Sequence, residues 1–314
     1  MSAQGITVVG SFAVGMTLRT GRMPVFGETL LGRDFDMGPG GKGSNQAVAV
    51  ARLGGRASFV GIVGDDKLAD IALALYRDEG VSTTHLERTT ERATGAGFII
   101  LSDAGDNAII LDMGANALMD AKFVDRAQQQ ISNSKVVMAV LEIPVAAAAR
   151  AMELGRQHHV TTILNPAPAQ RLAPEIFQFV DVLTPNESEL RILLGLPPDD
   201  PSPTRELAQR LMSFGVGTVV VTMGSEGALI LTGAETHEVP SVPVTVVDST
   251  GAGDAFNAGL ATALSEGRDL LDAVRFAVCC GALSCTQLGV IPSLARRPDV
   301  DRLYEEYFKY GRMQ

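Results

Sequence analysis

The sequence predicts an α/β protein built around a mainly parallel β-sheet with helices on both faces, and a smaller β-sheet beside it. Short apolar segments rich in β-branched residues alternate with longer segments whose apolar residues recur at helical spacing. This alternation is typical of parallel sheets, because consecutive parallel strands need a crossover helix between them. Two further segments are more polar and are interrupted by glycines, which favours a separate small sheet.

The first elements follow one another in a regular order. Residues 6–12 (ITVVGSF) form a short apolar run that ends in a polar segment, and they predict the first strand. Residues 44–54 carry apolar side chains at helical spacing and end in glycine, as many helices do. Residues 57–64 predict the next core strand, and residues 66–80 predict a helix that also ends in glycine.

The alternation continues through the second half of the chain. Helices are predicted up to His158 and around Leu207. In parallel sheets, ligands bind beyond the carboxyl ends of the strands, so polar residues at those ends are the first candidates for function. The apolar segments that predict the remaining core strands are residues 135–142, 161–168, 181–190 and 218–231.

The two polar segments lie at about residues 12–36 and 91–114. Over residues 17–36 the first is broken by three glycines and a proline, and the second shows two strand-like stretches joined by an Asp-Gly-type turn. We expect one domain over residues 1–314, with these two segments inserted in it as a small β-sheet.

The composition argues against several classes of function. A formal charge of −10 does not suit a protein that captures nucleic acid or anionic membranes. No stretch approaches the ~18 uninterrupted apolar residues of a membrane-spanning helix, so a cytoplasmic protein is expected. The cysteines, Cys279, Cys280 and Cys285, lack the spacing of a zinc or redox site and are expected to be core residues of a reduced protein.

The most informative motif occupies residues 246–264, where a predicted strand end leads through a glycine loop into a helix of small residues. Gly251 and Gly253 allow unusual dihedral angles and close approach of a ligand. Backbone N–H groups at a helix N-terminus attract an anion such as a phosphoryl group in transfer. Asp254, in the first helical turn, is placed to accept a proton from a hydroxyl. An isolated acid there often only complements the helix dipole, and the glycines favour the catalytic interpretation.

A second glycine-rich motif contains the pattern G-x-G-x-x-G at residues 38–43. It is not a dinucleotide fingerprint, because that pattern directly follows the first strand, whereas this one comes about thirty residues later. It is not a P-loop either, because Lys42 is followed by Gly43 where Ser or Thr is required. The motif offers backbone amides, Lys42 and Asn45 to a polyhydroxylated or anionic ligand, with a purely structural turn as the alternative.

Polar residues also follow three predicted strands. Asn186 and Glu189 are three residues apart and can bind magnesium, directly or through water, although a helix cap is the alternative. Thr222 and Gly224 either hold nucleotide phosphates or make a tight turn. Glu142 ends an apolar strand, where an acid is costly inside the sheet but suits a ligand contact at its edge.

Together these motifs resemble those of the ribokinase-like carbohydrate kinases. Gly-Lys-Gly with Asn comes early, Asn-x-x-Glu midway and Gly-Ala-Gly-Asp late, in the order and spacing of that family over nearly the whole chain. The last motif is the specific one. The resemblance implies a three-layer α/β domain with a small β-sheet lid, the use of ATP with Mg²⁺, and transfer of the γ-phosphoryl group to a hydroxymethyl of a small sugar such as ribose.

The resemblance also implies a role for each matching residue. Asp254 corresponds to the catalytic base. In ribokinases the lid also serves as a dimer surface, so a homodimer is expected. The other matches form an anion hole (Gly251, Ala252, Gly253), a sugar site (Gly41, Lys42, Asn45, Glu142), a nucleotide site (Asn186, Thr222, Gly224), a magnesium ligand (Glu189) and a site for a potassium-type ion (Asp248, Thr250, Gly289, Ser293).

One part of the chain departs from the ribokinase pattern. Ribokinases usually have Asn and Asp shortly after the first strand, where this chain has Ala13 and Gly15. A missing acceptor leaves ribose hydroxyls unpaired. Thr17 is a possible replacement, and Arg19 would suit an acceptor that carries an acid or a phosphate. The alternatives are therefore a kinase of a nucleoside, a sugar acid or a sugar phosphate, and a noncatalytic sugar or nucleotide sensor, which would not need Asp254.

Overall fold

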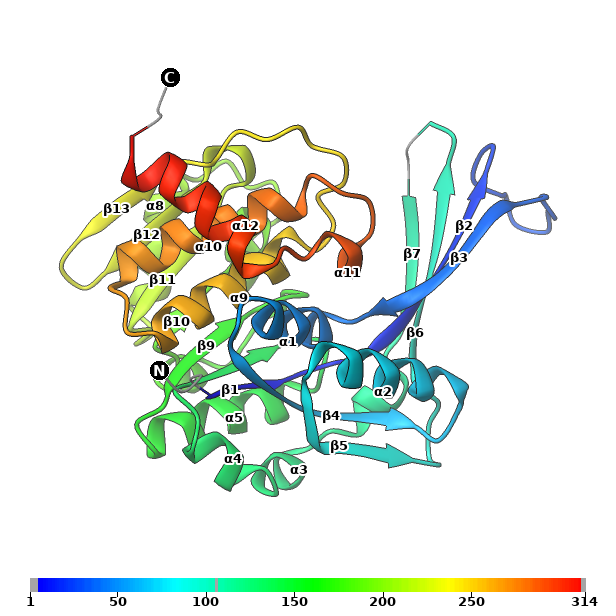
Figure 1. Cartoon of the computed structure of the whole chain (residues 1–314), viewed down its shortest axis with the longest axis horizontal. Coiled ribbons are helices and arrows are strands. Elements are labelled where there is room, and N and C mark those ends of the chain that lie inside the picture. Colours follow the sequence, from blue (N-terminus) through cyan, green and yellow to red (C-terminus); the bar gives the residue numbers. More distant parts are fainter. Residues whose placement is uncertain (1–4, 105–106, 312–314) are drawn as a thin grey trace.

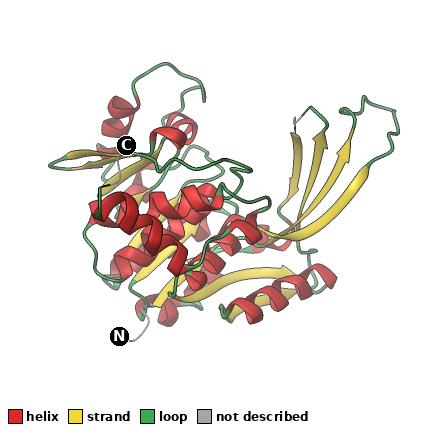
Figure 2. Ribbon diagram, turned by 45° about the horizontal axis from the view of Figure 1, so that its top comes forward, coloured by secondary structure: helices red, strands yellow, loops and turns green. Residues whose placement is uncertain are grey.

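The computed structural model describes residues 5–104 and 107–311 and has three layers, with a small sheet projecting from one side (Figures 1 and 2). Among the described residues, the main sheet has nine strands in the order β13-β12-β11-β10-β9-β8-β1-β4-β5. Strand β12 pairs antiparallel with β11 and β13, and the other pairs are parallel. The strands are β1 (Gly5–Val9), β4 (Arg56–Gly64), β5 (Ser82–Thr89), β8 (Val136–Val140), β9 (Thr161–Asn165), β10 (Val182–Leu183), β11 (Thr218–Thr222), β12 (Ala228–Thr232) and β13 (Thr236–Val239).

Two hydrophobic clusters, one on each face of the main sheet, hold the helical layers in place. The first layer contains α1 (Lys42–Arg52), α2 (Lys67–Glu79), α9 (Ala252–Ser265), α10 (Leu270–Ser284), α11 (Val290–Ser293) and α12 (Arg297–Tyr304). The second contains α3 (Ala121–Asp125), α4 (Gln128–Ser132), α5 (Val145–Gln157), α6 (Pro174–Phe177), α7 (Glu187–Leu193) and α8 (Thr204–Met212). The predicted three-layer α/β class is confirmed.

Strand β8 shows why the sequence pattern located the sheet. Its five residues, VVMAV, are all buried, because helices cover both of its faces. None of the helices in the described parts of the chain has the length and apolar character needed to cross a bilayer. Short helical turns of other types occupy Gly114–Leu118, Gly224–Glu226 and Glu305–Lys309.

The projecting sheet, called the lid here, has four strands in the order β3-β2-β6-β7 among the described residues. It stands away from the layered body in both ribbon views (Figures 1 and 2). The turn predicted between its last two strands includes Gly105 and Asp106, which lie outside the described residues. The strands are β2 (Ala13–Thr20), β3 (Arg33–Gly40), β6 (Gly95–Ser102) and β7 (Asn107–Asp112).

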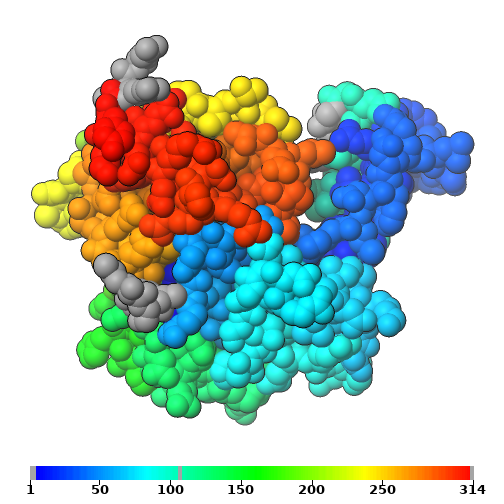
Figure 3. Space-filling view, viewed as in Figure 1, coloured from blue at the N-terminus to red at the C-terminus, as the bar shows by residue number. Residues whose placement is uncertain are grey.

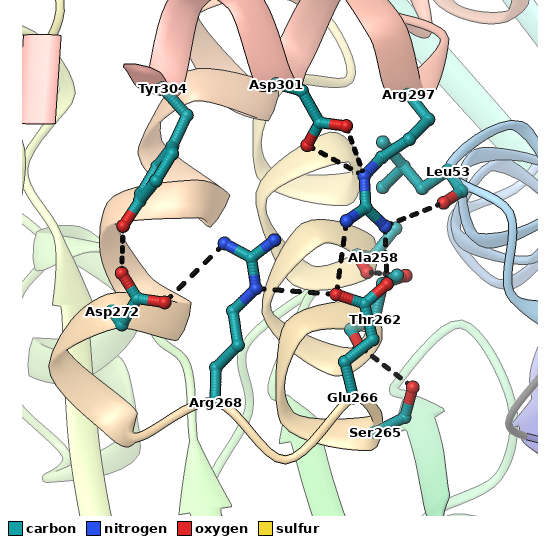
Figure 4. A network of polar contacts seen from close by, with 10 residues as sticks. All are labelled: Leu53, Ala258, Thr262, Ser265, Glu266, Arg268, Asp272, Arg297, Asp301 and Tyr304. Atoms are coloured by element: carbon teal, nitrogen blue, oxygen red, sulfur yellow. Dashed lines mark hydrogen bonds and ion pairs between the residues drawn. The ribbon is translucent and has the colours of Figure 1, made fainter. Parts of the chain in front are cut away.

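A network of charged side chains anchors the C-terminal helix α12 to α9 and α10 (Figure 4). Arg297, at the start of α12, pairs with Glu266 at the end of α9. Arg268 lies between Glu266 and Asp272, with N–O distances of 3.4 and 3.5 Å. The guanidinium groups of Arg268 and Arg297 lie 4.6 and 5.1 Å from the ring centre of Phe276. The C-terminal end of α9 is therefore held by side chains from two other segments.

The strand predicted just before Asp248 is absent, so this prediction is wrong. The described residues 240–251 form no strand. The backbone N–H groups of Val247 and Asp248 instead donate to the carbonyl oxygen of Cys285, at 2.8 and 3.2 Å. Cys285 ends helix α10. Valines favour extended backbone, but the partner that satisfies their amides depends on tertiary packing.

Candidate active site

Asp254 lies in the first turn of α9, which the chain enters through Gly251 in the left-handed conformation, with φ +84°. Its side chain is buried. Asn45 Nδ2 donates to Asp254 Oδ2 at 2.8 Å, and Gln46 Nε2 donates to Oδ1 at 3.0 Å. Burial raises the pKa of Asp254, and the charge of Lys42 and the two hydrogen bonds offset only part of this rise.

Gln46 is a site residue that the sequence analysis did not single out. It is fully buried, and its Nε2 also donates to Asn165 Oδ1 at 3.0 Å, at the end of β9. The side-chain carbonyl oxygens of Asn45 and Gln46 are buried without a partner among the described residues. Two buried acceptors beside a carboxylate are suited to bind hydroxyl groups. The available signal was a polar Asn-Gln pair just before an apolar run in a predicted helix.

The N-terminus of α1 meets the segment that leads into the lid. Gly41 has φ +90°, and a Cβ there would lie 2.8 Å from Ala13 N and 2.9 Å from Ser11 O, so only glycine fits. Lys42 N and Ser11 Oγ both donate to Glu142 Oε2, at 2.8 and 2.6 Å. Glu142 follows β8. One carboxylate therefore joins a helix start, a strand end and the base of the lid.

Lys42 supplies positive charge to this region. Burial disfavours its ammonium form, but the carboxylates of Asp254, Glu142 and Glu189 outweigh that effect and raise the pKa of Lys42. The side chain therefore stays protonated at neutral pH. A fixed ammonium group among acids is well placed to bind the oxygens of a phosphoryl group.

Asn186 and Glu189 form a capping box at the start of α7. Asn186 Oδ1 accepts from Glu189 N, and Glu189 Oε2 accepts from Asn186 N, both at 2.8 Å. Burial raises the pKa of Glu189, and Lys42 counteracts part of the rise. Asn186 and Thr222 share a β-bridge, and together with Gly224 they line a pocket of about 440 Å³. Asn186 therefore belongs both to the cap and to the pocket wall.

Asp248 connects two loops beside the N-terminus of α9. Its Oδ1 accepts from Thr250 N at 2.9 Å, and its Oδ2 accepts from Gly289 N at 3.1 Å. Burial opposes ionisation of Asp248, but the hydrogen bonds from Thr250 and Gly289 outweigh it and lower the pKa. Ser293 Oγ donates to Val290 O at 2.8 Å, which closes the turn of α11 after Gly289. An ionised carboxylate therefore lies within this pair of loops.

The predicted site residues fall into three adjoining groups. Around Asp254, Asn45 is directly hydrogen-bonded, Lys42 is coupled through its charge, and Ala252 and Gly253 lie in the first turn of α9. Glu142 joins this group through the backbone N–H of Lys42. The electrostatic coupling of Glu189 with Lys42 and Asp254 joins the α7 pocket to this group. The Asp248 loops adjoin it through Val290, whose Cγ1 would lie 2.6 Å from a Cβ on Gly251. The groups were predicted separately from the sequence.

The space-filling view places an indentation between the lid and the body, bordered on the body by the segment around α11 (Figure 3). The body is a three-layer α/β unit, and the N-terminus of its helix α9 has no side-chain cap and presents a buried carboxylate beside a lysine. These features together define the class of ribokinase-like phosphotransferases.

Comparison with known proteins identifies the family. The profile described as "pfkB family carbohydrate kinase" matches residues 3–297. The chain belongs to the pfkB family of carbohydrate kinases, and it is a phosphotransferase that uses ATP and an alcohol acceptor.

The relatives share almost the full length of the chain. Ribokinase of Bacillus subtilis is 36% identical over 300 residues, which cover 96% of this chain and 99% of the relative. Deoxyribokinase of Salmonella typhi is 35% identical over 301 residues, with coverages of 96% and 97%. The structure of Arabidopsis thaliana ribokinase complexed with ribose and ATP superimposes with a TM-score of 0.91 at 30% identity, covering 96% of this chain and 99% of that one.

The two glycines at the start of α9 are expected to respond oppositely to alanine. Gly251→Ala should lower the free energy of unfolding by at least about 1 kcal/mol, because an L residue in the left-handed region is strained and the new Cβ would meet Val290. Gly253→Ala should raise it by about 0.5–1 kcal/mol, because nothing lies within 4 Å of a Cβ at this helical position. Urea denaturation measures both. Equal changes in the free energy of unfolding for the two variants would contradict the left-handed conformation of Gly251.

Proposed function

We propose that this protein is an ATP-dependent sugar kinase that phosphorylates a hydroxymethyl group of ribose or a related small sugar, with Asp254 as general base. The observation that carries the proposal is the buried carboxylate of Asp254 at the N-terminus of α9, hydrogen-bonded on both oxygens and adjacent to Lys42. The relatives named ribokinase and deoxyribokinase, and the relative solved with ribose and ATP, support this substrate class.

In the proposed reaction the acceptor hydroxymethyl loses its proton to Asp254 as its oxygen forms a bond to the γ-phosphorus. The bond between that phosphorus and the bridging oxygen breaks, and ADP leaves. Asn45 and Gln46 orient the carboxylate, and their unpaired carbonyl oxygens accept hydrogen bonds from other sugar hydroxyls. Lys42 and the amides at the start of α9 stabilise charge on the transferring oxygens.

The raised pKa of Asp254 suits this role. A base whose pKa lies closer to neutrality takes a hydroxyl proton more readily than an ordinary aspartate does. Burial provides the rise, and the charge of Lys42 and the hydrogen bonds from Asn45 and Gln46 oppose part of it. A noncatalytic sensor gains nothing from a buried carboxylate at this position, since burying a charge without use destabilises the fold.

We also propose Mg²⁺ and a potassium-type ion as cofactors. No cluster of three or more His, Cys, Asp or Glu suited to a metal occurs in residues 5–104 and 107–311. Mg²⁺ does not need such a cluster, because it commonly takes one or two protein carboxylates and completes its shell with phosphates and water. Glu189 would supply the carboxylate beside Asn186, and the ion would neutralise phosphate charge. Asp248, with its lowered pKa, and the turn from Gly289 to Ser293 fit a monovalent cation.

The kinase proposal is tested by ATP turnover with a panel of pentoses in the presence of Mg²⁺, with and without K⁺. We expect transfer to at least one sugar, and a loss of about 10²–10⁴-fold in kcat for Asp254→Asn, the usual contribution of a general base. The amide keeps the size of the side chain. Full activity of Asp254→Asn would rule out the base, and turnover insensitive to K⁺ would rule out the monovalent site.

Gln46→Leu should move the pH profile of the enzyme. The substitution removes a hydrogen bond that lowers the pKa of Asp254, so that pKa rises and the acid limb of kcat/KM shifts to higher pH. A purely structural defect would lower kcat/KM by one factor at every pH. The matched control is Gln157→Leu, because Gln157 Nε2 donates to the surface residue Glu153, at 3.2 Å, away from Asp254. An unshifted acid limb in Gln46→Leu would contradict the coupling.

We further propose a homodimer formed through the lid. Met37, Phe98 and Ile110 lie in one cross-strand row with Met16, and their exposed fractions are 46%, 51% and 72%. A contiguous exposed apolar row is typical of an interface. Ile110→Lys should convert a dimer to a monomer in light scattering, whereas Val246→Lys, which alters a 65% exposed residue of the body, should not. A monomeric wild type would contradict the proposal.

A further inference from the structure

One face of the lid carries almost no side chains near the active site. Strand register aligns Gly38, Gly15 and Gly97 as neighbours across three strands, with Leu111 of β7 at the end of the row. Side chains alternate along β2, so Gly15 shares a face with Ala13. Three adjacent strands therefore present bare backbone on the same face of the sheet.

This bare face points toward the active site. Ser11, which precedes β2, donates its hydroxyl to Glu142 in the site, and Ala13 and Gly15 continue the same alternation. On the opposite side, Phe12 packs against Tyr76 with ring centres 6.1 Å apart, and Val14 belongs to the same buried cluster. The glycine row therefore faces Glu142 and the N-terminus of α1.

The fold does not require glycine at these three positions. A Cβ on Gly15 would meet only Ile99 Cδ1 at 3.5 Å and Gly38 O at 3.8 Å, and one on Gly38 would meet nothing within 4 Å. A Cβ on Gly97 would meet only Leu111 Cδ1 at 3.8 Å. None of the three has a positive φ. Because glycine weakens a strand, its use here is best explained by the space it leaves.

Other glycines nearby, unlike these three, are required by close contacts or by a positive φ. A Cβ on Gly95, two residues before Gly97 along β6, would lie 2.6 Å from Asn116 Nδ2 and 2.9 Å from Phe12 O. Gly41 has the positive φ and the close contacts described above. The open row is thus a local feature of the site-facing surface rather than a general property of this glycine-rich chain.

The row lies at the end of the acceptor site that is remote from Asp254. Gly41, at the start of α1, contacts Ala13, and Gly15 lies two residues further along β2, about 7 Å at strand spacing. A sugar whose hydroxymethyl reaches Asp254 directs its opposite end toward this surface. The backbone amides there are used in the sheet, and the bordering side chains Ile99 and Leu111 are apolar. Within the row itself this end offers volume but no side-chain partner for a hydroxyl, and the nearest polar side chains on this face, Thr17 and Asp36, lie two residues further along their strands.

We propose that the preferred acceptor is a pentoside, a pentose whose end remote from the phosphorylated hydroxymethyl carries a neutral apolar or planar substituent, rather than the free sugar. The inference rests on the proposed kinase function. An anionic substituent is disfavoured, because Arg19 lies four residues beyond Gly15, about 13 Å along the strand, and Asp36 stands opposite Thr17 between them. The bare glycine surface instead suits a flat or apolar group packed against the sheet.

The experiment compares kcat/KM for ribose, methyl β-D-ribofuranoside, uridine and ribose 1-phosphate with the full-length enzyme and ATP. We expect at least one of the two neutral ribosides to exceed ribose by about tenfold or more, the scale on which an apolar pocket discriminates. Gly15→Val, which fills the row, should lower the riboside value by about tenfold or more and change the ribose value much less. Gly38→Ala provides a milder second variant, since its Cβ meets nothing within 4 Å.

The control variant is Gly233→Val. Gly233 lies between β12 and β13 on the body, and nothing lies within 4 Å of a Cβ there. The Gly233→Val variant should therefore show the same ratio of kcat/KM for ribosides to kcat/KM for ribose as the wild type. A wild type that prefers ribose, or an equal loss on all acceptors in Gly15→Val and Gly38→Ala, would overturn the inference while leaving an Asp254-dependent kinase in place. A preference for ribose 1-phosphate would overturn it in favour of an anionic acceptor. No transfer to any acceptor would instead refute the proposed kinase function.

Discussion

The hydrogen bonds from Asn45 and Gln46 to Asp254 are the interaction on which the rest of the site depends. They join the first turns of α1 and α9, two helices from opposite ends of the chain. A buried carboxylate without such partners costs several kcal/mol, so these helix starts are stable only when they lie together. The pairing also acts on the pKa of Asp254, because the same donors oppose the rise that burial causes.

Close backbone approach follows from this pairing. A Cβ on Gly43 would lie 2.7 Å from Gly10 Cα, so α1 can approach the end of β1 only through glycine. At the other helix, a Cβ on Gly259 would lie 2.6 Å from Cys280 Sγ, which shows how closely α9 packs on α10. The three cysteines are therefore packing residues where they are buried. Burial raises the pKa of Cys279 to about 12, which makes it inert as a thiolate nucleophile.

The sequence pattern predicted those features of the fold that depend on local residue type, namely the core strands and the polar residues at their ends. Apolar β-branched runs located the core strands, and polar residues at their ends, such as Glu142 and Asn186, lie together in the candidate site, because parallel strands bring those ends to one edge. What it missed depends on tertiary partners. Val247 was assigned to a strand, but its amide bonds the end of α10. Gln46 was passed over because nothing local distinguishes a buried glutamine that holds a carboxylate from one at a helix surface.

The lid shows how strand register alone can give one sheet two separate roles. Shifting to the next residue on each strand moves from the row Gly38–Gly15–Gly97–Leu111 to the row Met37–Met16–Phe98–Ile110, and the side chains change face. The first row is open toward the acceptor, and the second exposes apolar surface away from it. A one-residue slip in β2 would place Met16 over the acceptor and remove apolar surface from the outer face. The proposed acceptor specificity and the proposed lid association would therefore both depend on the same strand register.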